Sequence, residues 1–243
     1  MAKMRIDKLL SNMGYGSRRE IKSDLKMGKI TVNGITAKDP SSMIDTESDK
    51  VMYLDDLVEY REFVYIMMNK PQGVISATED SREETVIDLL PDSYKAFSPF
   101  LVGRLDKDTE GLLIITNNGK MAHNMLSPKK HVKKLYYAHV SGKGLTQKDV
   151  LDFSRGIFLN EDNYKCLPAE LKILDSKENE STCEVIIEEG KYHQVKRMFE
   201  ASGRTVTFLK RISMGPIELD SNIAPGDFRE LNDREMELLE NYL

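Results

Sequence analysis

The sequence predicts an α+β protein with a small helix–helix–hairpin domain at its N-terminus and a larger domain built on a mainly antiparallel mixed sheet with flanking helices. Three observations predict this class. The 243 residues are 40% hydrophobic, enough for two unequal domains with separate cores. Helical periodicity and a hairpin signal alternate closely in the first 35 residues. Beyond residue 62, strand-like runs dominate and do not alternate regularly with helices, which excludes a doubly wound fold.

The first 35 residues predict two helices and a hairpin. Apolar residues spaced i, i+3, i+4 and i+7 over Ile6–Met13 form the buried stripe of a helix that ends at Gly14. Ser17-Arg-Arg-Glu20 is a capping box, and the helix that it begins ends near Gly28. After a short strand, Asn33-Gly34 is the pair that best fits a type I′ hairpin turn.

Cations form a row on the second predicted helix. Arg18, Lys22 and Lys26 recur at i, i+4 and i+8, and Arg19 lies beside them. Charge runs usually do no more than solvate a helix face. A polyanion partner therefore needs support from outside this row.

The charge of the whole chain is segregated. The formal net charge is −5, yet residues 1–35 hold eight Lys and Arg against three acids, and residues 36–60 hold two lysines against seven acids. Residues 119–142 carry five lysines and no acid, and residues 190–211 carry six Lys and Arg against one acid. A polyanion can bind locally to such a chain although its average charge is repulsive.

Several classes of protein are excluded by composition. Cys166 and Cys183 lie seventeen positions apart and form no ligand cluster with the four histidines, which argues against a structural zinc site and a disulfide framework. The first twenty residues lack the apolar segment of a signal peptide, and no run approaches a membrane span. We expect a cytoplasmic protein that does not engage a membrane.

The acidic stretch Asp45–Glu59 is the expected junction, with a strand at Val51–Leu54, so the predicted domains are residues 1–60 and 61–243. A polar tract at Thr78–Glu84 is a candidate mobile loop. The larger domain is expected to contain strands at 63–68, 112–115, 183–187 and 205–209, and helices at 86–90, 120–126, 146–154, 193–201 and 233–242.

The segment Gly103–Thr116 is the strongest candidate for chemistry, because it places three acids within five residues. Asp106-x-Asp108 followed by Gly111 imitates a calcium loop, but Asn117 stands where the bidentate Glu would be needed. A polar turn before a strand would explain the composition without any function.

The motif G-R-L-D-x-x-T-x-G-L-L in this segment resembles the signature of the RsuA/RluA group of pseudouridine synthases. Three other segments are similar to the same group: Asn69–Val74, Lys134-Leu-Tyr136 and Glu189–Phe199. Residues 3–48 resemble the small RNA-binding domain of the fourth protein of the small ribosomal subunit. The resemblance implies an RNA-binding module joined to a catalytic domain.

The resemblance implies Asp106 as the catalytic nucleophile, Lys196 as its ion-pair partner and Tyr136 as a ring for stacking and proton transfer. Tyr137 and Arg197 adjoin these last two, and motif position alone selects between neighbours. Attack on the ribose, attack on the uracil and elimination to a glycal all stay open. No cofactor and no metal is expected. The expected RNA-binding residues are Arg18, Arg19, Lys22, Lys26, Arg104, Lys129, Lys130, Lys133, Lys134, Lys191 and Arg197.

The implied activity is isomerisation of one uridine in small-subunit (16S) ribosomal RNA, with the target base flipped out of its stack. Gly190-Lys-Tyr-His-Gln194 favours the small subunit. The alternatives are the same chemistry on large-subunit ribosomal RNA and a non-catalytic RNA-binding factor in ribosome assembly. A third alternative is a metal-dependent nuclease that uses Asp106, Asp108 and Glu110. It is the weakest of the three, because these acids have no histidine partner. The expected partner is ribosomal RNA or an assembly intermediate, and the expected state is a monomer.

Overall fold

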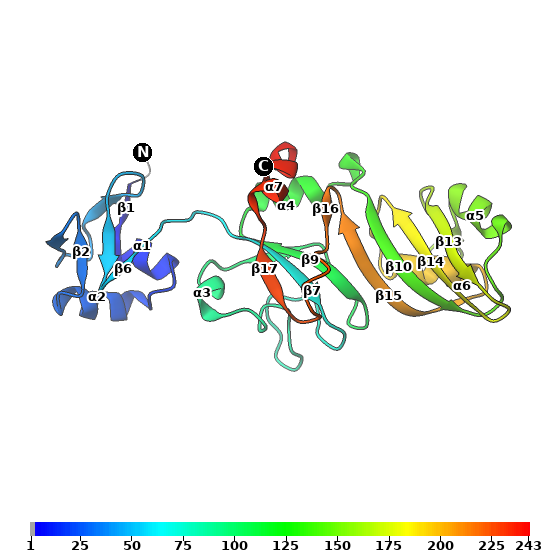
Figure 1. Ribbon diagram of the computed structural model, residues 1–243, viewed down its shortest axis with the longest axis horizontal. Helices are drawn as coiled ribbons and strands as arrows, with labels where there is room; N and C mark the ends of the chain where they lie inside the picture. The colour runs from blue at the N-terminus through cyan, green and yellow to red at the C-terminus, as the bar shows by residue number, and fades with distance from the viewer. Residues whose placement is uncertain (1–2) are drawn as a thin grey trace. The chain divides into compact units, whose positions relative to one another are not determined.

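The computed structural model describes residues 3–243, and the chain forms two compact units (Figure 1). The first unit comprises the residues up to 64 together with 87–100, and the second comprises 65–86 and 101–243. The domain boundary at residue 60 stays a prediction, and no sequence pattern indicates that 87–100 belongs with the first unit. Every helix in the described part of the chain is too short or too polar to cross a membrane.

The first unit contains the predicted helix–helix–hairpin. Ser17 Oγ accepts a hydrogen bond from the Glu20 N–H, and the Glu20 carboxylate accepts one from the Ser17 N–H, so the capping box is present. Asn33 and Gly34 have φ of 50° and 79°, as a type I′ turn requires. The elements are α1 (Ile6–Asn12), α2 (Arg18–Lys26) and α3 (Asp92–Lys95), the pair β1 (Lys3–Arg5) and β4 (Met43–Asp45), and a sheet of order β3 (Ile35–Thr36), β2 (Ile30–Val32), β5 (Val51–Tyr53) and β6 (Asp56–Leu57).

The second unit is built on a nine-stranded sheet. Its order is β13 (Glu170–Ser176), β14 (Glu180–Ile187), β10 (Lys134–Ser141), β15 (Thr205–Met214), β9 (Glu110–Thr116), β7 (Tyr65–Lys70) and β17 (Phe228–Glu230), with β16 (Ile217–Glu218) on β15 and β8 (Phe100–Val102) on β9. The β15–β9 pair is parallel, whereas β13–β14, β14–β10, β10–β15, β9–β7 and β7–β17 are antiparallel. The predicted mainly antiparallel mixed sheet is confirmed.

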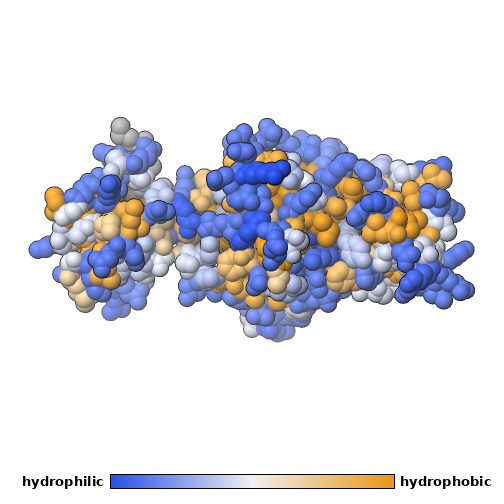
Figure 2. Space-filling model, in the orientation of Figure 1, coloured by the Kyte–Doolittle hydropathy of each residue, from blue (hydrophilic) through white to orange (hydrophobic). Residues whose placement is uncertain are grey.

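Helices cover one face of this sheet at its β13 side (Figure 1). Alternate residues Tyr136, Ala138 and Val140 of β10 are buried in one core with Phe153 and Phe199 from the helices. The opposite face is open, and Figure 2 shows a hydrophobic area over β13 and β14 among hydrophilic surroundings. The remaining elements are α4 (Gly119–Leu126), η1 (Pro128–Lys130), α5 (Gln147–Ser154), the hairpin β11 (Phe158–Leu159) and β12 (Tyr164–Lys165), α6 (Gln194–Ala201), α7 (Asp233–Leu238) and η2 (Glu240–Tyr242).

Two predicted helices differ in the structure. Residues 86–90 form a turn, because the Val86 N–H donates to the Ile75 carbonyl and Pro91 follows directly. The C-terminal helix predicted over 233–242 is interrupted at Leu239, where α7 gives way to η2.

Gly111, in the segment Gly103–Thr116, is required by the close approach of two strands. Gly111 opposes Arg211 where β9 and β15 run parallel, and its φ is 105°. A Cβ atom at Gly111 would lie 2.2 Å from the Arg211 carbonyl oxygen. Only glycine allows this approach of the two strands.

Candidate active site

Asp106 lies in the loop that joins β8 to β9, and the residue before it is held by a serine. The Ser76 hydroxyl donates to the Leu105 carbonyl oxygen at 2.7 Å and accepts from the Leu105 N–H at 3.1 Å. The Asp106 carbonyl oxygen accepts from the Thr109 N–H at 3.1 Å, which closes a turn. These bonds fix the backbone on both sides of the Asp106 side chain.

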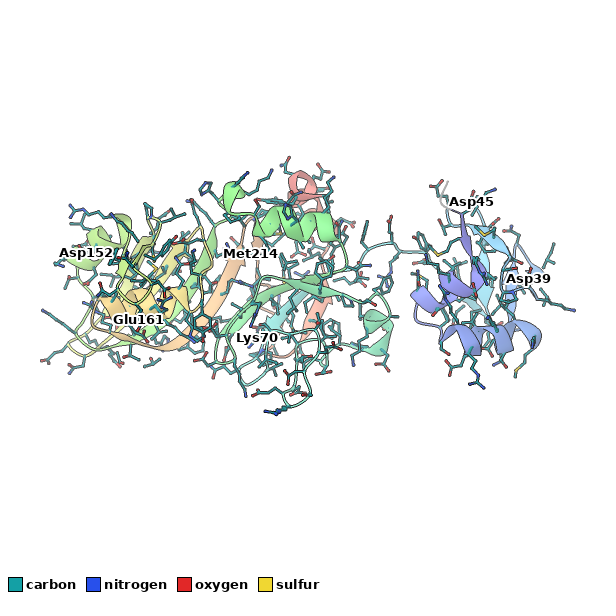
Figure 3. All side chains as sticks on the ribbon, turned by 180° about the vertical axis from the view of Figure 1, so that it is seen from behind. Asp39, Asp45, Lys70, Asp152, Glu161 and Met214 are labelled. Carbon is teal, nitrogen blue, oxygen red and sulfur yellow. The ribbon has the colours of Figure 1, made fainter. Side chains whose placement is uncertain are left out.

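A buried lysine holds the other side of the same loop. Lys70 ends β7 beside β9 (Figure 3), and its Nζ donates to the carbonyl oxygens of Pro71 at 2.9 Å, Thr109 at 3.0 Å and Lys107 at 3.4 Å. Burial lowers the pKa of Lys70 to about 8, although nearby carboxylates act in the opposite direction. Lys70 therefore stabilises the loop through its backbone.

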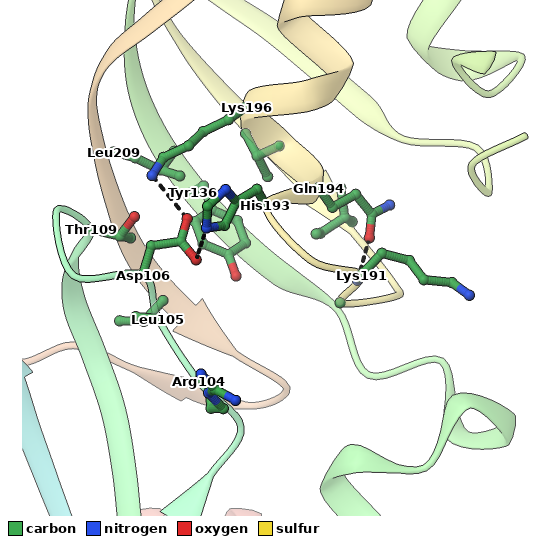
Figure 4. A pocket seen from close by; sticks show the side chains of 13 residues that line it. Arg104, Leu105, Asp106, Thr109, Tyr136, Lys191, His193, Gln194, Lys196 and Leu209 are labelled. Carbon is green, nitrogen blue, oxygen red and sulfur yellow. Dashed lines mark hydrogen bonds and ion pairs between the residues drawn. The ribbon is translucent and has the colours of Figure 1, made fainter. Parts of the chain in front are cut away.

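The Asp106 carboxylate forms an ion pair with Lys196 on α6 (Figure 4). Lys196 Nζ lies 2.9 Å from Asp106 Oδ2 and 2.6 Å from Asp108 Oδ1. Burial alone would lower the pKa of Lys196, but the hydrogen bonds to Asp108 and Asp106 outweigh it and raise the pKa above its ordinary value. The ammonium therefore stays charged beside Asp106 at neutral pH.

His193 is a second neighbour of this carboxylate. It adopts the left-handed conformation, with φ of 48°, just before α6 begins. Its Nε2 lies 3.4 Å from Asp106 Oδ1, and its ring stacks on the exposed Tyr192 ring at a centroid distance of 3.8 Å. The turn that begins α6 thus places an imidazole and an open aromatic surface beside Asp106.

Tyr136 lines the same hollow as Asp106, together with Arg104 and Leu209 (Figure 4). It is only 7% exposed. The neighbouring Tyr137 points to the other face of β10, where its hydroxyl lies 2.9 Å from His139 Nε2. The geometry therefore favours Tyr136 over Tyr137 as a site residue.

Two adjoining hollows of about 70 and 660 Å³ meet at Asp106 and Arg104. The combined space is within the range of small-molecule sites and suits a nucleotide. A carboxylate held beside a charged ammonium, with a flat aromatic ring and apolar side chains next to it, can act as a nucleophile on a planar heterocycle.

The predicted RNA-binding residues separate into several groups. The α2 cations are exposed, as are Lys129, Lys130 and Arg104. The ammonium of Lys191 lies 4.5 Å from the centre of the Tyr164 ring, and Lys133 pairs with Glu170 at 2.7 Å. None of these positions conflicts with a contact to RNA.

Two of the predicted RNA-binding residues do not lie free on the surface of the protein. Lys134 is buried, and its Nζ donates to the Val132 carbonyl oxygen at 2.9 Å, because β10 places this side chain inward. Arg197 points away from Asp106 and pairs with Asp162 at 2.7 Å and with Glu161 at 3.6 Å. Lys196 and not Arg197 therefore contacts Asp106.

Sequence reasoning gave no role to three residues of this region. Ser76 and Lys70 act on the backbone of the loop. Lys70 lies inside the quoted segment Asn69–Val74, whereas Ser76 would be an ordinary turn residue by pattern. His193 lies inside a quoted motif, but its contact with Asp106 depends on the left-handed turn before α6. In the described part of the chain no group of three or more His, Cys, Asp or Glu is placed to hold a metal ion.

Comparisons with known proteins identify the family of the chain. The profile of the family described as RNA pseudouridylate synthase matches residues 64–201, and that of the S4 domain matches residues 4–51. A solved structure described as a pseudouridylate synthase superposes with a TM-score of 0.67 and 32% identity, over 97% of this chain and 99% of the other.

Several relatives match nearly the whole chain, and the following three are examples. An uncharacterized RNA pseudouridine synthase of Bacillus subtilis (strain 168), YtzG, is 49% identical over 97% of this chain and 98% of its own. A ribosomal large subunit pseudouridine synthase B of the same organism is 37% identical over 97% and 95%. A ribosomal small subunit pseudouridine synthase A of Vibrio cholerae is 36% identical over 96% and 98%. The chain thus belongs to the RNA pseudouridylate synthase family and is an isomerase with an N-terminal S4 domain.

Proposed function

We propose that this enzyme converts one uridine of small-subunit (16S) ribosomal RNA to pseudouridine, with Asp106 as its nucleophile. The observation that carries the proposal is the Asp106–Lys196 ion pair of 2.9 Å in a hollow lined by Tyr136. The choice of subunit rests on the Gly190–Gln194 segment, which lines the same hollow, and on the relatives named for the small subunit.

The reaction breaks the bond between N1 of uracil and the ribose C1′, turns the base, and joins C5 to C1′. The C5 proton leaves and N1 gains one, so no oxidant, cofactor or metal is consumed. Asp106 supplies the attacking carboxylate and Lys196 balances its charge. Tyr136 supplies a stacking face for the uracil and a hydroxyl for proton transfer.

RNA reaches the site as an unstacked nucleotide. Flipping the target costs a few kcal/mol, which protein contacts must offset. Arg104, exposed at the junction of the hollows, is the residue that we assign to the vacated stack or to a phosphate. The α2 cations supply affinity through the phosphate backbone. We further propose a monomeric, cytoplasmic enzyme with domains 1–60 and 61–243.

A second candidate function is the same reaction on large-subunit ribosomal RNA. The 37% identity to a large-subunit enzyme favours it. The non-catalytic assembly factor is set aside because the chain belongs to an enzyme family.

The test is a map of pseudouridines in both ribosomal RNAs from cells with the gene, without it, and with an Asp106→Asn copy. We expect one site in small-subunit RNA to disappear without the gene and to stay absent with the Asp106→Asn copy. Loss of a site only in large-subunit RNA would overturn the choice of subunit. Unchanged maps of both RNAs would contradict a ribosomal substrate.

A further inference from the structure

A cavity of about 540 Å³ adjoins the Asp106 hollow and has no part in the chemistry described above. The two spaces share Arg104, Tyr136, Gly190 and Lys191 as lining residues. Much of the rest of its wall comes from the end of α4, the segment between α4 and β10, and the loop between β14 and α6, and Gly103, Lys134, Tyr164, Leu167 and Arg211 complete it. An RNA strand with its target base at Asp106 would therefore have an adjacent nucleotide at this cavity.

Two buried cations line this cavity, Lys134 and Arg211. Arg211 is 2% exposed, its Nε donates to the Leu112 carbonyl oxygen at 2.8 Å, and its Nη2 has no hydrogen-bond partner among residues 3–243. Lys134 is 9% exposed and has one carbonyl acceptor, from Val132. Burial and then the charge of Arg211 lower the pKa of Lys134 to about 8. Two like charges thus lie close together away from water, which is costly unless an anion joins them.

Glu188 and Glu189 line the same cavity, but each is already engaged by other groups and does not fully neutralise Lys134 and Arg211. The Glu189 carboxylate accepts from the Tyr164 hydroxyl at 2.6 Å, from the Leu167 N–H at 2.9 Å and from the Gln194 amide at 2.5 Å. Glu188 Oε2 lies 3.1 Å from His131 Nδ1. The charges of Glu188 and Glu189 act on Lys134, but both carboxylates are hydrogen-bonded or paired with groups other than Lys134 and Arg211, and both cations line the cavity.

We propose that the Lys134 ammonium and the Arg211 guanidinium bind a phosphate group of the RNA strand, that of a nucleotide adjacent to the target uridine. The inference rests on the proposed function for the identity of the strand. A phosphate offers several acceptor oxygens and a negative charge, which match an ammonium and a guanidinium edge. A neutral base would leave the two cations uncompensated. Arg104 and Lys191 stand where the cavity meets the active-site hollow and favour entry of the same anion.

The first experiment compares Lys134→Met with Lys172→Met in turnover of a transcript of the target RNA. Lys172 is a matched control, because it is exposed on β13 and pairs with Glu184. We expect Lys134→Met to raise KM about tenfold or more, the effect of one lost charge-assisted hydrogen bond, with little change in kcat. The slope of log KM against log salt concentration should fall by about 0.8. Lys172→Met should match the wild-type protein.

The thermal midpoint separates a binding role from a structural one. Removal of a buried, repelled charge should leave the midpoint of Lys134→Met unchanged or raised. A lowered midpoint with unchanged KM would mean that Lys134 only supports the wall of the cavity, and would overturn the proposal.

The second experiment works even if ribosomal RNA is not the substrate. Inorganic phosphate is titrated into the full-length protein while the lysine side chains are followed by NMR, with Lys134→Met used to assign the signal. We expect a saturable shift of the Lys134 signal and a pKa above 8, neither of which potassium chloride at equal ionic strength reproduces. A Lys134 signal that responds identically to both salts would contradict the proposal. Failure of turnover with a positive titration would instead contradict the choice of RNA.

Discussion

Replacement of Gly111 by Ala is expected to destabilise the second unit strongly. Gly111 stands where β9 and β15 run parallel, directly after the loop that carries Asp106. The new Cβ would lie 2.2 Å from the Arg211 carbonyl oxygen and 2.7 Å from its nitrogen, both of them backbone atoms. Neither can move aside without separating the two strands.

The magnitude follows from two contributions. An L-residue at the φ of Gly111, 105°, costs about 1–3 kcal/mol. Forcing a methyl group into a packed contact costs about another 1–3 kcal/mol. The sum, about 4 kcal/mol, is a large part of the roughly 5–15 kcal/mol by which a domain is stable.

The assay is urea unfolding at equilibrium, with Gly119→Ala as the matched control. Gly119 begins α4, has no atom within 4 Å of an added Cβ, and should become slightly more stable as Ala, by up to about 1 kcal/mol. A Gly111→Ala protein within about 1 kcal/mol of the wild type would refute this account of the strand contact and of the glycine in the motif.

Three further predictions concern charge. Lys196→Met should lower tritium release from C5-labelled uridine at least about a hundredfold, and Lys196→Arg should lose less, because it keeps a cation beside the carboxylate. Burial lowers the pKa of Lys134 to about 8 from 10.5. Between these two pH values the unfolded chain binds more protons than the folded chain, so the free energy of unfolding should rise with pH. Lys134→Met should remove about 3 kcal/mol of that rise, as measured by urea unfolding at several pH values. Replacing Arg18, Arg19 and Lys22 by Ala should lower the slope of log binding constant against log salt concentration by roughly 2, whereas an unchanged slope would place the RNA contacts elsewhere.

Local patterns predicted much of the fold. The capping box at Ser17 and the Asn33-Gly34 turn depend on neighbouring residues alone, so the sequence contains the whole signal. The segment 86–90 was the counterexample, because its backbone pairs with Ile75 and no local pattern reveals that partner.

The sequence indicates the two residues of the central ion pair, Asp106 and Lys196, but not the arrangement of the side chains around them. Motif spacing selects Asp106 and Lys196, yet it cannot show that Asp108 shares the same ammonium. Lys134 reads as one of several surface lysines, because the inward orientation of its side chain depends on how β10 packs. Arg211 is a hundred residues from Gly111 in the sequence. The need for a glycine at position 111 arises from the contact between β9 and β15, and no local pattern shows that contact.

The assignment of Asp106 as the nucleophile is tested by tritium release from C5-labelled uridine in RNA, measured for Asp106→Asn beside Asp108→Asn. Asn is nearly isosteric with Asp, so folding and RNA affinity should persist, and the thermal midpoint and the RNA dissociation constant serve as controls. We expect no release by Asp106→Asn and substantial release by Asp108→Asn, because the Asp108 carboxylate is largely exposed and only shares Lys196. Near-normal release by Asp106→Asn would contradict the assignment of Asp106 as the nucleophile.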